Sequence, residues 1–68
     1  MGALTITVNG KERDVAARTV ADLLPELGLD GGYALVERNG EPVERAAYSD
    51  VELANGDSLV VARPVAGG

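Results

Sequence analysis

The C-terminal stretch Pro64-Val65-Ala66-Gly67-Gly68 contains the residues whose types point most directly to chemistry. It follows a predicted final strand and ends in two glycines, the second of which carries a carboxylate. Because glycine has no Cβ atom, such a segment can stay extended and enter a slot too narrow for other residues. A diglycine end is a weak signal by itself. Its weight depends on whether the rest of the chain carries any other chemical equipment.

The rest of the chain lacks the side chains that usually perform catalysis or bind metals. The 68 residues include no cysteine and no histidine. These absences exclude a disulfide framework, a zinc knuckle and a thiol nucleophile, and they remove the usual general base. There is also no Gly-rich phosphate-binding loop with a lysine. The composition therefore disfavours an enzyme, and we expect no metal site and no bound cofactor.

The charge balance is acidic, with six Lys and Arg against eleven Asp and Glu and a formal net charge of −5. The charges are scattered, which is typical of a solvated surface, although they could also attract a basic protein partner. Nucleic acid is disfavoured as a ligand because phosphate binding needs a basic face. No apolar run approaches the roughly 20 residues that cross a bilayer, so no membrane association and a cytoplasmic location are expected.

The chain opens with a predicted β-hairpin. Leu4, Ile6 and Val8 alternate with threonines, which is the period of a half-buried strand. Asn9-Gly10 is the strongest short-range hairpin signal. Residues 11–15 then return as a second, more polar strand near a sheet edge.

The next segment predicts one amphipathic helix. Thr19 is a suitable N-cap and Gly28 a suitable stop after the last turn. Apolar residues recur between them at helical spacing: Val20, Leu23, Leu24 and Leu27. Pro25 lacks an N–H and is expected to kink or shorten this helix.

Three further strands are predicted after the helix. Residues 33–39 form an apolar strand in the interior of the sheet, and Pro42 limits the next one to a short edge strand around Val43. Residues 45–50 are expected to be irregular, with Tyr48 folded onto the core. The last strand, 58–62, places Leu59 and Val61 on one face and Val60 and Ala62 on the other.

This order of elements favours an α+β fold in which one helix covers one face of a mixed sheet of four or five strands. The arrangement that satisfies it is the β-grasp, or ubiquitin-like, roll, with the first and last strands parallel and adjacent at its centre. We predict a β-grasp domain over residues 1–63 and a flexible tail over residues 64–68.

Five stretches together resemble the bacterial sulfur carrier proteins of thiamin biosynthesis (ThiS-like). They are Leu4-Thr5-Ile6-Thr7-Val8-Asn9-Gly10, Thr19-Val20-Ala21-Asp22-Leu23-Leu24, Val36-Glu37-Arg38-Asn39-Gly40-Glu41, Gly56-Asp57 and Gly67-Gly68. The resemblance covers nearly the whole chain in the same order and with similar spacing. The wider relatives are the small subunit of molybdopterin synthase and ubiquitin-like modifiers, which are β-grasp folds that end in Gly-Gly.

The resemblance implies a reaction at the C-terminus. An E1-like activating enzyme would adenylate the carboxylate of Gly68 with ATP, and sulfur from a cysteine desulfurase or rhodanese-type donor would then replace AMP. Thiazole synthase would use the resulting thiocarboxylate. Gly67 and Ala66 would give the tail access to the activating enzyme. The lack of cysteine agrees, because sulfur carried by this chain has to sit on the terminus.

The side of the sheet away from the helix is the expected partner surface. We predict an interface of Val60, Ala62, Pro64 and Val65, against the alternative that the two strand residues are ordinary half-exposed positions. Partner contacts by Arg38, Arg45 and Arg63, and electrostatic steering by Glu52 and Asp57, compete with a plain solvated-surface interpretation.

Three other functions remain open at this point. The chain could carry sulfur for another product, such as molybdopterin, cysteine, a thiolated tRNA or a secondary metabolite. It could be a ubiquitin-like modifier that forms isopeptide bonds through Gly68. It could also be a non-covalent interaction module in which the two glycines are incidental.

Overall fold

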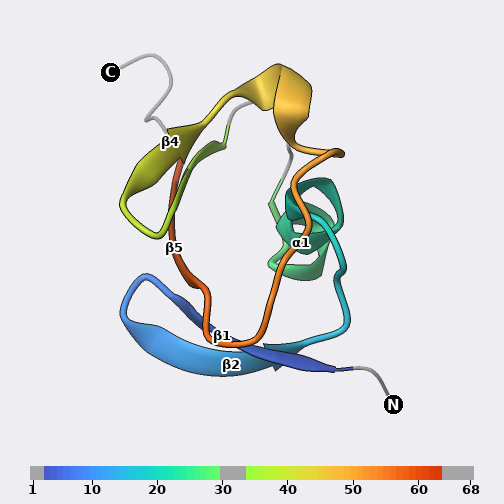
Figure 1. The fold of residues 1–68 in the computed structure, drawn as a ribbon, viewed down its shortest axis with the longest axis vertical. Helices are drawn as coiled ribbons and strands as arrows, with labels where there is room; N and C mark the ends of the chain where they lie inside the picture. The colour runs from blue at the N-terminus through green and yellow to red at the C-terminus, as the bar shows by residue number, and fades with distance from the viewer. Residues whose placement is uncertain (1–2, 30–33, 64–68) are drawn as a thin grey trace.

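The computed structural model describes residues 3–29 and 34–63. The elements, in chain order, are β1 (Leu4–Val8), β2 (Lys11–Val15), α1 (Val20–Glu26), β3 (Leu35–Arg38), β4 (Glu41–Val43), the 3₁₀ turn η1 (Arg45–Ala47) and β5 (Ser58–Ala62). Five strands form one mixed sheet in the order β2-β1-β5-β3-β4. The sheet curls, and α1 lies on its concave side (Figure 1).

The sheet has the predicted β-grasp topology. β1 and β5 are parallel neighbours at its centre, and every other neighbouring pair is antiparallel. β3 lies between β5 and β4, so its predicted interior position is confirmed, although it begins at Leu35. Tyr33, with which we expected this strand to start, lies outside the described residues.

The core lies between α1 and the concave face of the sheet. It is built almost entirely from aliphatic side chains, in a chain that has two Tyr and no Phe or Trp. The largest fully buried side chains are Ile6, Leu23, Leu24, Leu59, Val15 and Val20. Alternation along the strands decides which residues point inward, so Leu59 and Val61 join this core while Val60 and Ala62 face outward.

α1 is short, as Pro25 predicted. The Thr19 hydroxyl accepts a hydrogen bond from the Asp22 amide at 3.1 Å and caps the first turn. The helix ends at Glu26, one residue after the proline, and Gly28 follows with a φ of +80°. The Glu26 carboxylate accepts hydrogen bonds from the amides of Ala16 (3.0 Å) and Ala17 (2.9 Å). These bonds attach the end of the helix to the segment that follows β2.

The segment between β4 and β5 is more regular than predicted at its start. Residues 45–47 form one turn of 3₁₀ helix, which the amide of Tyr48 extends by donating to the Arg45 carbonyl at 3.1 Å. The Tyr48 ring is buried, as predicted, and its hydroxyl donates to the Ala34 carbonyl at 2.7 Å. Tyr48 therefore closes one end of the core and satisfies its polar atom there.

Each of the three Asn-Gly turns also attaches to a distant strand through its asparagine side chain. Asn9 and Asn39 have positive φ angles of 52° and 53°, which suit hairpin turns. Their carboxamides bind the backbone of β5, whereas the carboxamide of Asn55 accepts from the Thr5 amide at 2.8 Å in β1. The Asn9-Gly10 motif predicted a reversal of the chain, but none of the three motifs predicted these cross-links.

Candidate functional site

Two of the predicted partner-interface residues lie in the described part of the chain. Val60 and Ala62 are both exposed on the outer face of β5, and Val60 retains 50% of its exposure. The other predicted site residues are Pro64, Val65, Ala66, Gly67 and Gly68. They lie outside the described residues, so their roles stay predictions.

Val60 and Ala62 belong to a larger apolar patch on the outer face of the sheet. Leu35 stands directly opposite Ala62 across the β3–β5 ladder and is 56% exposed, the highest value among the large hydrophobic residues described. Glu37 separates Val60 from Pro42 in the same cross-strand row. We call Leu35, Pro42, Val60 and Ala62 the apolar patch.

The apolar patch is hollowed rather than flat. Its four residues line a depression of about 310 Å³ together with Val36, Glu37 and Val43. Glu37 is the one charged residue in that lining. A depression of this kind, apolar with an acidic residue beside it, suits a protein partner that presents an apolar side chain near a basic one.

Leu35 and Pro42 were not predicted to belong to this surface. The run Ala34-Leu35-Val36 is apolar on both faces, so its pattern does not show which residue points outward. Pro42 was interpreted only as a limit on strand length. Pairing each expected strand with its neighbour would have supplied the missing signal, because Leu35 lies beside Ala62 once β3 and β5 are adjacent.

The other half of the outer sheet face is polar. Thr5 and Thr7 of β1 stand opposite Asp14 and Glu12 of β2, and the Thr5 hydroxyl donates to Asp14 at 2.7 Å. Ser58 continues this polar surface at the start of β5. The apolar patch is therefore confined to β3, β4 and the C-terminal half of β5, where the chain leaves the sheet toward residues 64–68.

Asp57, which we considered as a steering charge, is instead buried. Only 6% of the residue is exposed. Its carboxylate accepts hydrogen bonds from Arg38 Nε (3.0 Å), the Asn39 carboxamide (3.1 Å) and the Ala54 amide (2.9 Å). Arg38 is thus committed to an internal ion pair, so the structure gives both residues a role in joining the β3–β4 turn to the start of β5.

The environment of Asp57 keeps its carboxyl group ionised. Burial alone raises the pKa of this group, because it disfavours the charged form. The hydrogen bonds from Ala54, Asn39 and Arg38, together with the guanidinium charge, outweigh burial and hold the pKa below its ordinary value of 3.8. In the described residues, no buried side-chain polar atom lacks a hydrogen-bond partner.

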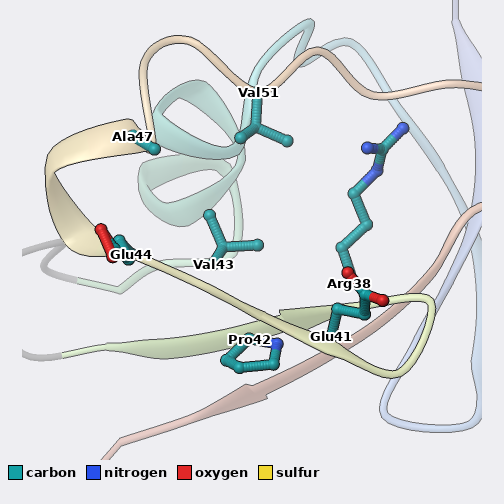
Figure 2. Close-up of a pocket in the computed structure, with 7 residues that line it drawn as sticks. All are labelled: Arg38, Glu41, Pro42, Val43, Glu44, Ala47 and Val51. Atoms are coloured by element: carbon teal, nitrogen blue, oxygen red, sulfur yellow. The ribbon is translucent and has the colours of Figure 1, made fainter.

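A second hollow lies between the β3–β4 hairpin and η1 (Figure 2). It has a volume of about 270 Å³ and is lined by Arg38, Glu41, Pro42, Val43, Glu44, Ala47 and Val51. The valines and Ala47 make one side of it apolar, and the polar lining consists of one guanidinium and two carboxylates. This set includes no nucleophile with an adjacent general base, so it does not form the kind of site that catalyses group transfer.

The described residues also offer no metal site and no membrane span. Within residues 3–29 and 34–63, no three His, Cys, Asp or Glu side chains gather closely enough to hold a metal ion. In the same ranges, no helix is long and apolar enough to cross a membrane.

The fold and the surface together define a class. A five-stranded sheet with one helix, an apolar outer patch beside the end of β5 and the pair Gly67-Gly68 shortly after that strand are features of the β-grasp carrier proteins that the sequence resembles. Residues 6–68 match the model of the ThiS family. The chain therefore belongs to the ThiS family, a family of sulfur carriers of thiamin biosynthesis.

Solved structures agree with this assignment. The chain is similar to the crystal structure of the thiamine biosynthesis protein (ThiS) from Geobacter metallireducens, with a TM-score of 0.80 and 33% identity, covering 96% of this chain and 100% of that one. An NMR structure of a thiamine biosynthesis protein from the same organism gives a TM-score of 0.79 at 33% identity, covering 96% and 88% of the two chains. These matches confirm the predicted fold.

A curated relative is much longer than this chain. Over 66 residues, the chain is 39% identical to a thiazole synthase of Paramagnetospirillum magneticum (strain ATCC 700264 / AMB-1). The match covers 96% of this chain but 20% of the relative. The chain thus spans about a fifth of the length of that protein.

Proposed function

We propose that this protein carries sulfur as a thiocarboxylate on Gly68. An E1-like activating enzyme transfers AMP from ATP to the Gly68 carboxylate and releases pyrophosphate. A sulfur nucleophile then attacks the acyl carbon, the bond from that carbon to the AMP oxygen breaks, and AMP leaves. The cysteine desulfurase or rhodanese-type donor supplies the sulfur indirectly, as a persulfide that two equivalents of a thiol reduce to sulfide while the thiols form a disulfide. The protein itself binds no cofactor.

The observation that carries this proposal is the extent of the family match. It runs from residue 6 to residue 68 and therefore includes Gly67-Gly68 together with the folded domain. The sequence is consistent with it, because a chain without cysteine offers no thiol on which sulfur could be carried. Activation is needed because a carboxylate is a poor acyl donor, whereas an acyl adenylate has a competent leaving group.

We further propose that the apolar patch, with Pro64 and Val65, is the surface that the activating enzyme binds. The patch lies where β5 ends, so a partner seated on it would be close to the segment that leads to Gly68. Gly67 and Ala66 then have the small side chains that a narrow channel to the nucleotide requires.

Thiazole synthase is the proposed acceptor of the sulfur. The support is the Paramagnetospirillum magneticum relative, in which a segment similar to this chain lies within a longer protein named thiazole synthase. A carrier and its acceptor that occur in one chain are expected to be partners when they occur as two. We place both encounters in the cytoplasm, where ATP and the biosynthetic enzymes are available.

Intact-mass spectrometry tests the proposal. The protein is incubated with ATP, a thiamin-type activating enzyme and sulfide, and its mass is recorded. We expect the gain that corresponds to one oxygen replaced by sulfur. The matched control is a variant that lacks Gly68, which should show no gain. An unchanged wild-type mass would contradict the proposal, and recovery in covalent adducts with other proteins would favour a ubiquitin-like modifier instead.

A further inference from the structure

The hydrogen bonding between β1 and β5 continues past the last residue of β1. The parallel ladder contains the pairs Thr7–Ser58 and Val8–Leu59. The Asn9 amide then donates to the Leu59 carbonyl at 2.9 Å, and the chain turns away from β5 with a φ of 52° at Asn9. The part of β5 beyond Leu59 therefore needs another partner on its β1 side.

The side chain of Asn9 supplies that partner. Its Oδ1 accepts a hydrogen bond from the Val61 amide at 2.9 Å, and its Nδ2 donates to the Val61 carbonyl at 3.0 Å. A carboxamide holds a donor and an acceptor in one plane, as a peptide group does. The Asn9 side chain thus takes the place of the next β1 residue and satisfies both backbone groups that Val61 directs toward β1.

Val61 occupies a position that matters for the proposed function. It is the last inward-pointing residue of β5, and its two neighbours, Val60 and Ala62, belong to the apolar patch. Gly68 follows Val61 by seven residues in the sequence. A shift of Val61 relative to β1 would therefore move the apolar patch and the point from which the C-terminal residues depart.

We propose that Asn9 is a positioning residue for the carrier reaction. Through its two hydrogen bonds to Val61, it fixes the end of β5 against β1, and so it holds the apolar patch in the position that the activating enzyme must recognise. This inference rests on the proposed function for its consequence. Its geometric part stands on the Asn9–Val61 contacts alone.

A simpler explanation of Asn9 is that the hairpin turn needs a residue that tolerates positive φ. Asn39 has nearly the same φ, 53°, yet its side chain makes different contacts, with Ser58 and Asp57. The turn conformation therefore does not by itself dictate a bond to Val61. Replacing Asn9 with glycine separates the two explanations, because glycine keeps the positive φ at no steric cost but removes the carboxamide.

Three variants make the test. Asn9→Gly removes both hydrogen bonds and keeps the turn. Asn9→Asp keeps an acceptor for the Val61 amide but loses the donor and sets a negative charge against the Val61 carbonyl. Asn55→Gly is the matched control, because it removes one asparagine hydrogen bond, to the Thr5 amide at the opposite end of β1.

Two readouts are recorded for each variant. Amide hydrogen exchange by NMR reports the local opening of β5 without any partner. We expect Asn9→Gly to speed exchange at Val61 by about tenfold or more and to leave Ile6 in the core unchanged. In the adenylation assay, we expect Asn9→Gly to raise the KM for the carrier about three- to ten-fold and to change kcat by less than about twofold. Asn9→Asp should raise this KM further. Asn55→Gly should speed exchange at Thr5 and leave the KM unchanged.

Each other outcome contradicts a defined part of the proposal. Unchanged exchange at Val61 in Asn9→Gly would show that the carboxamide does not hold β5. Faster exchange at Val61 with an unchanged KM would show that the end of β5 does not matter for recognition. If Asn55→Gly raised the KM as much as Asn9→Gly does, the effect would come from a general loss of stability and not from the Asn9–Val61 contacts. If the wild-type chain is not adenylated, the proposed function fails together with the link to recognition, while exchange at Val61 still decides the geometric part.

Discussion

The two ends of β5 are held to their neighbours by different chemistry. At its start, the buried carboxylate of Asp57 accepts three hydrogen bonds, one of them in an ion pair with Arg38. At its end, a neutral carboxamide from Asn9 holds Val61, and the outer surface beside it is the apolar patch. A charged group is thus buried at the start of β5, and an apolar surface is exposed at its end.

This difference assigns the stability of the fold to one end of β5 and the recognition of a partner to the other. The network around Asp57 joins two turns and the first residues of β5, so its loss should lower the stability of the whole domain. The apolar patch is already exposed, so changing it should cost little in folding and much in recognition. The six residues from Asp57 to the end of β5 therefore carry both tasks, divided along their length.

The largest expected effect on stability comes from Asp57→Ala. The substitution removes a buried acceptor of three hydrogen bonds and leaves Arg38 and the Ala54 amide without their partner. We expect a loss of about 2–4 kcal/mol in the free energy of unfolding, below the value for a fully buried ion pair because the Arg38 side chain is 33% exposed. Urea unfolding followed by circular dichroism measures it.

The control for this substitution is Asp50→Ala, at an exposed aspartate. We expect it to change the unfolding free energy by less than about 0.5 kcal/mol. Equal losses in the two variants would show that overall charge, and not the network at the start of β5, produces the effect.

Val60→Asp should weaken binding to the partner and leave the stability nearly unchanged, in contrast to Asp57→Ala. A charge in the middle of the apolar patch must be desolvated when an apolar partner surface covers it, so we expect binding to the activating enzyme to weaken about tenfold or more. The unfolding free energy should change by less than about 1 kcal/mol, because Val60 is half exposed. Titration calorimetry with the activating enzyme measures the binding.

Ser58→Asp is the matched control, because it adds the same charge on the same face of the same strand but outside the patch. We expect it to change the affinity less than threefold. If both variants weaken binding equally, the partner responds to charge on this face, and the apolar patch is not the contact surface.

Asn39→Asp tests the first end of β5 more gently. Its Oδ1 acceptor for the Ser58 amide is retained, but the donor to Asp57 is replaced by a second carboxylate. We expect a loss of about 1–2 kcal/mol from the missing bond and the repulsion between like charges. Asn55→Asp retains the acceptor that its own contact uses and should lose less, and the opposite order by urea unfolding would contradict the role assigned to Asp57.

Much of the fold could be predicted from the sequence because its signals are local. The alternation of Leu4, Ile6 and Val8, the cap at Thr19 and the Asn-Gly turns each depend on a few neighbouring residues. Even the shortening effect of Pro25 follows from one missing N–H. The order of elements favoured a β-grasp arrangement, with one helix on one face of a mixed sheet. That arrangement places β1 beside β5.

The interactions that hold the two ends of β5 were not predicted, because they join residues far apart in the chain. Asp57 follows an Asn-Gly turn and looks like a solvated loop residue until Arg38 and Asn39 are brought beside it. Asn9 looks like a turn residue and nothing more, because no local pattern indicates that its carboxamide binds Val61. The outward position of Leu35 was not predicted for a related reason, because a continuous apolar run does not indicate which of its residues face the core of the protein.

The pH dependence of stability is the smallest effect and isolates Asp57. Its folded-state pKa lies below the ordinary value of 3.8, so the carboxylate contributes stability that is fully present above that value. The contribution is lost as the pH falls below 3.8 and through the folded-state pKa. Asp57→Asn cannot ionise and lacks this dependence, so the gap in unfolding free energy between wild type and variant should narrow with acidification. Urea midpoints collected in steps from neutral pH to below pH 3.8 measure the gap, and the other carboxylates cancel because both proteins contain them. A gap that stays constant through that range would mean that hydrogen-bond geometry, and not the charge of Asp57, secures the start of β5.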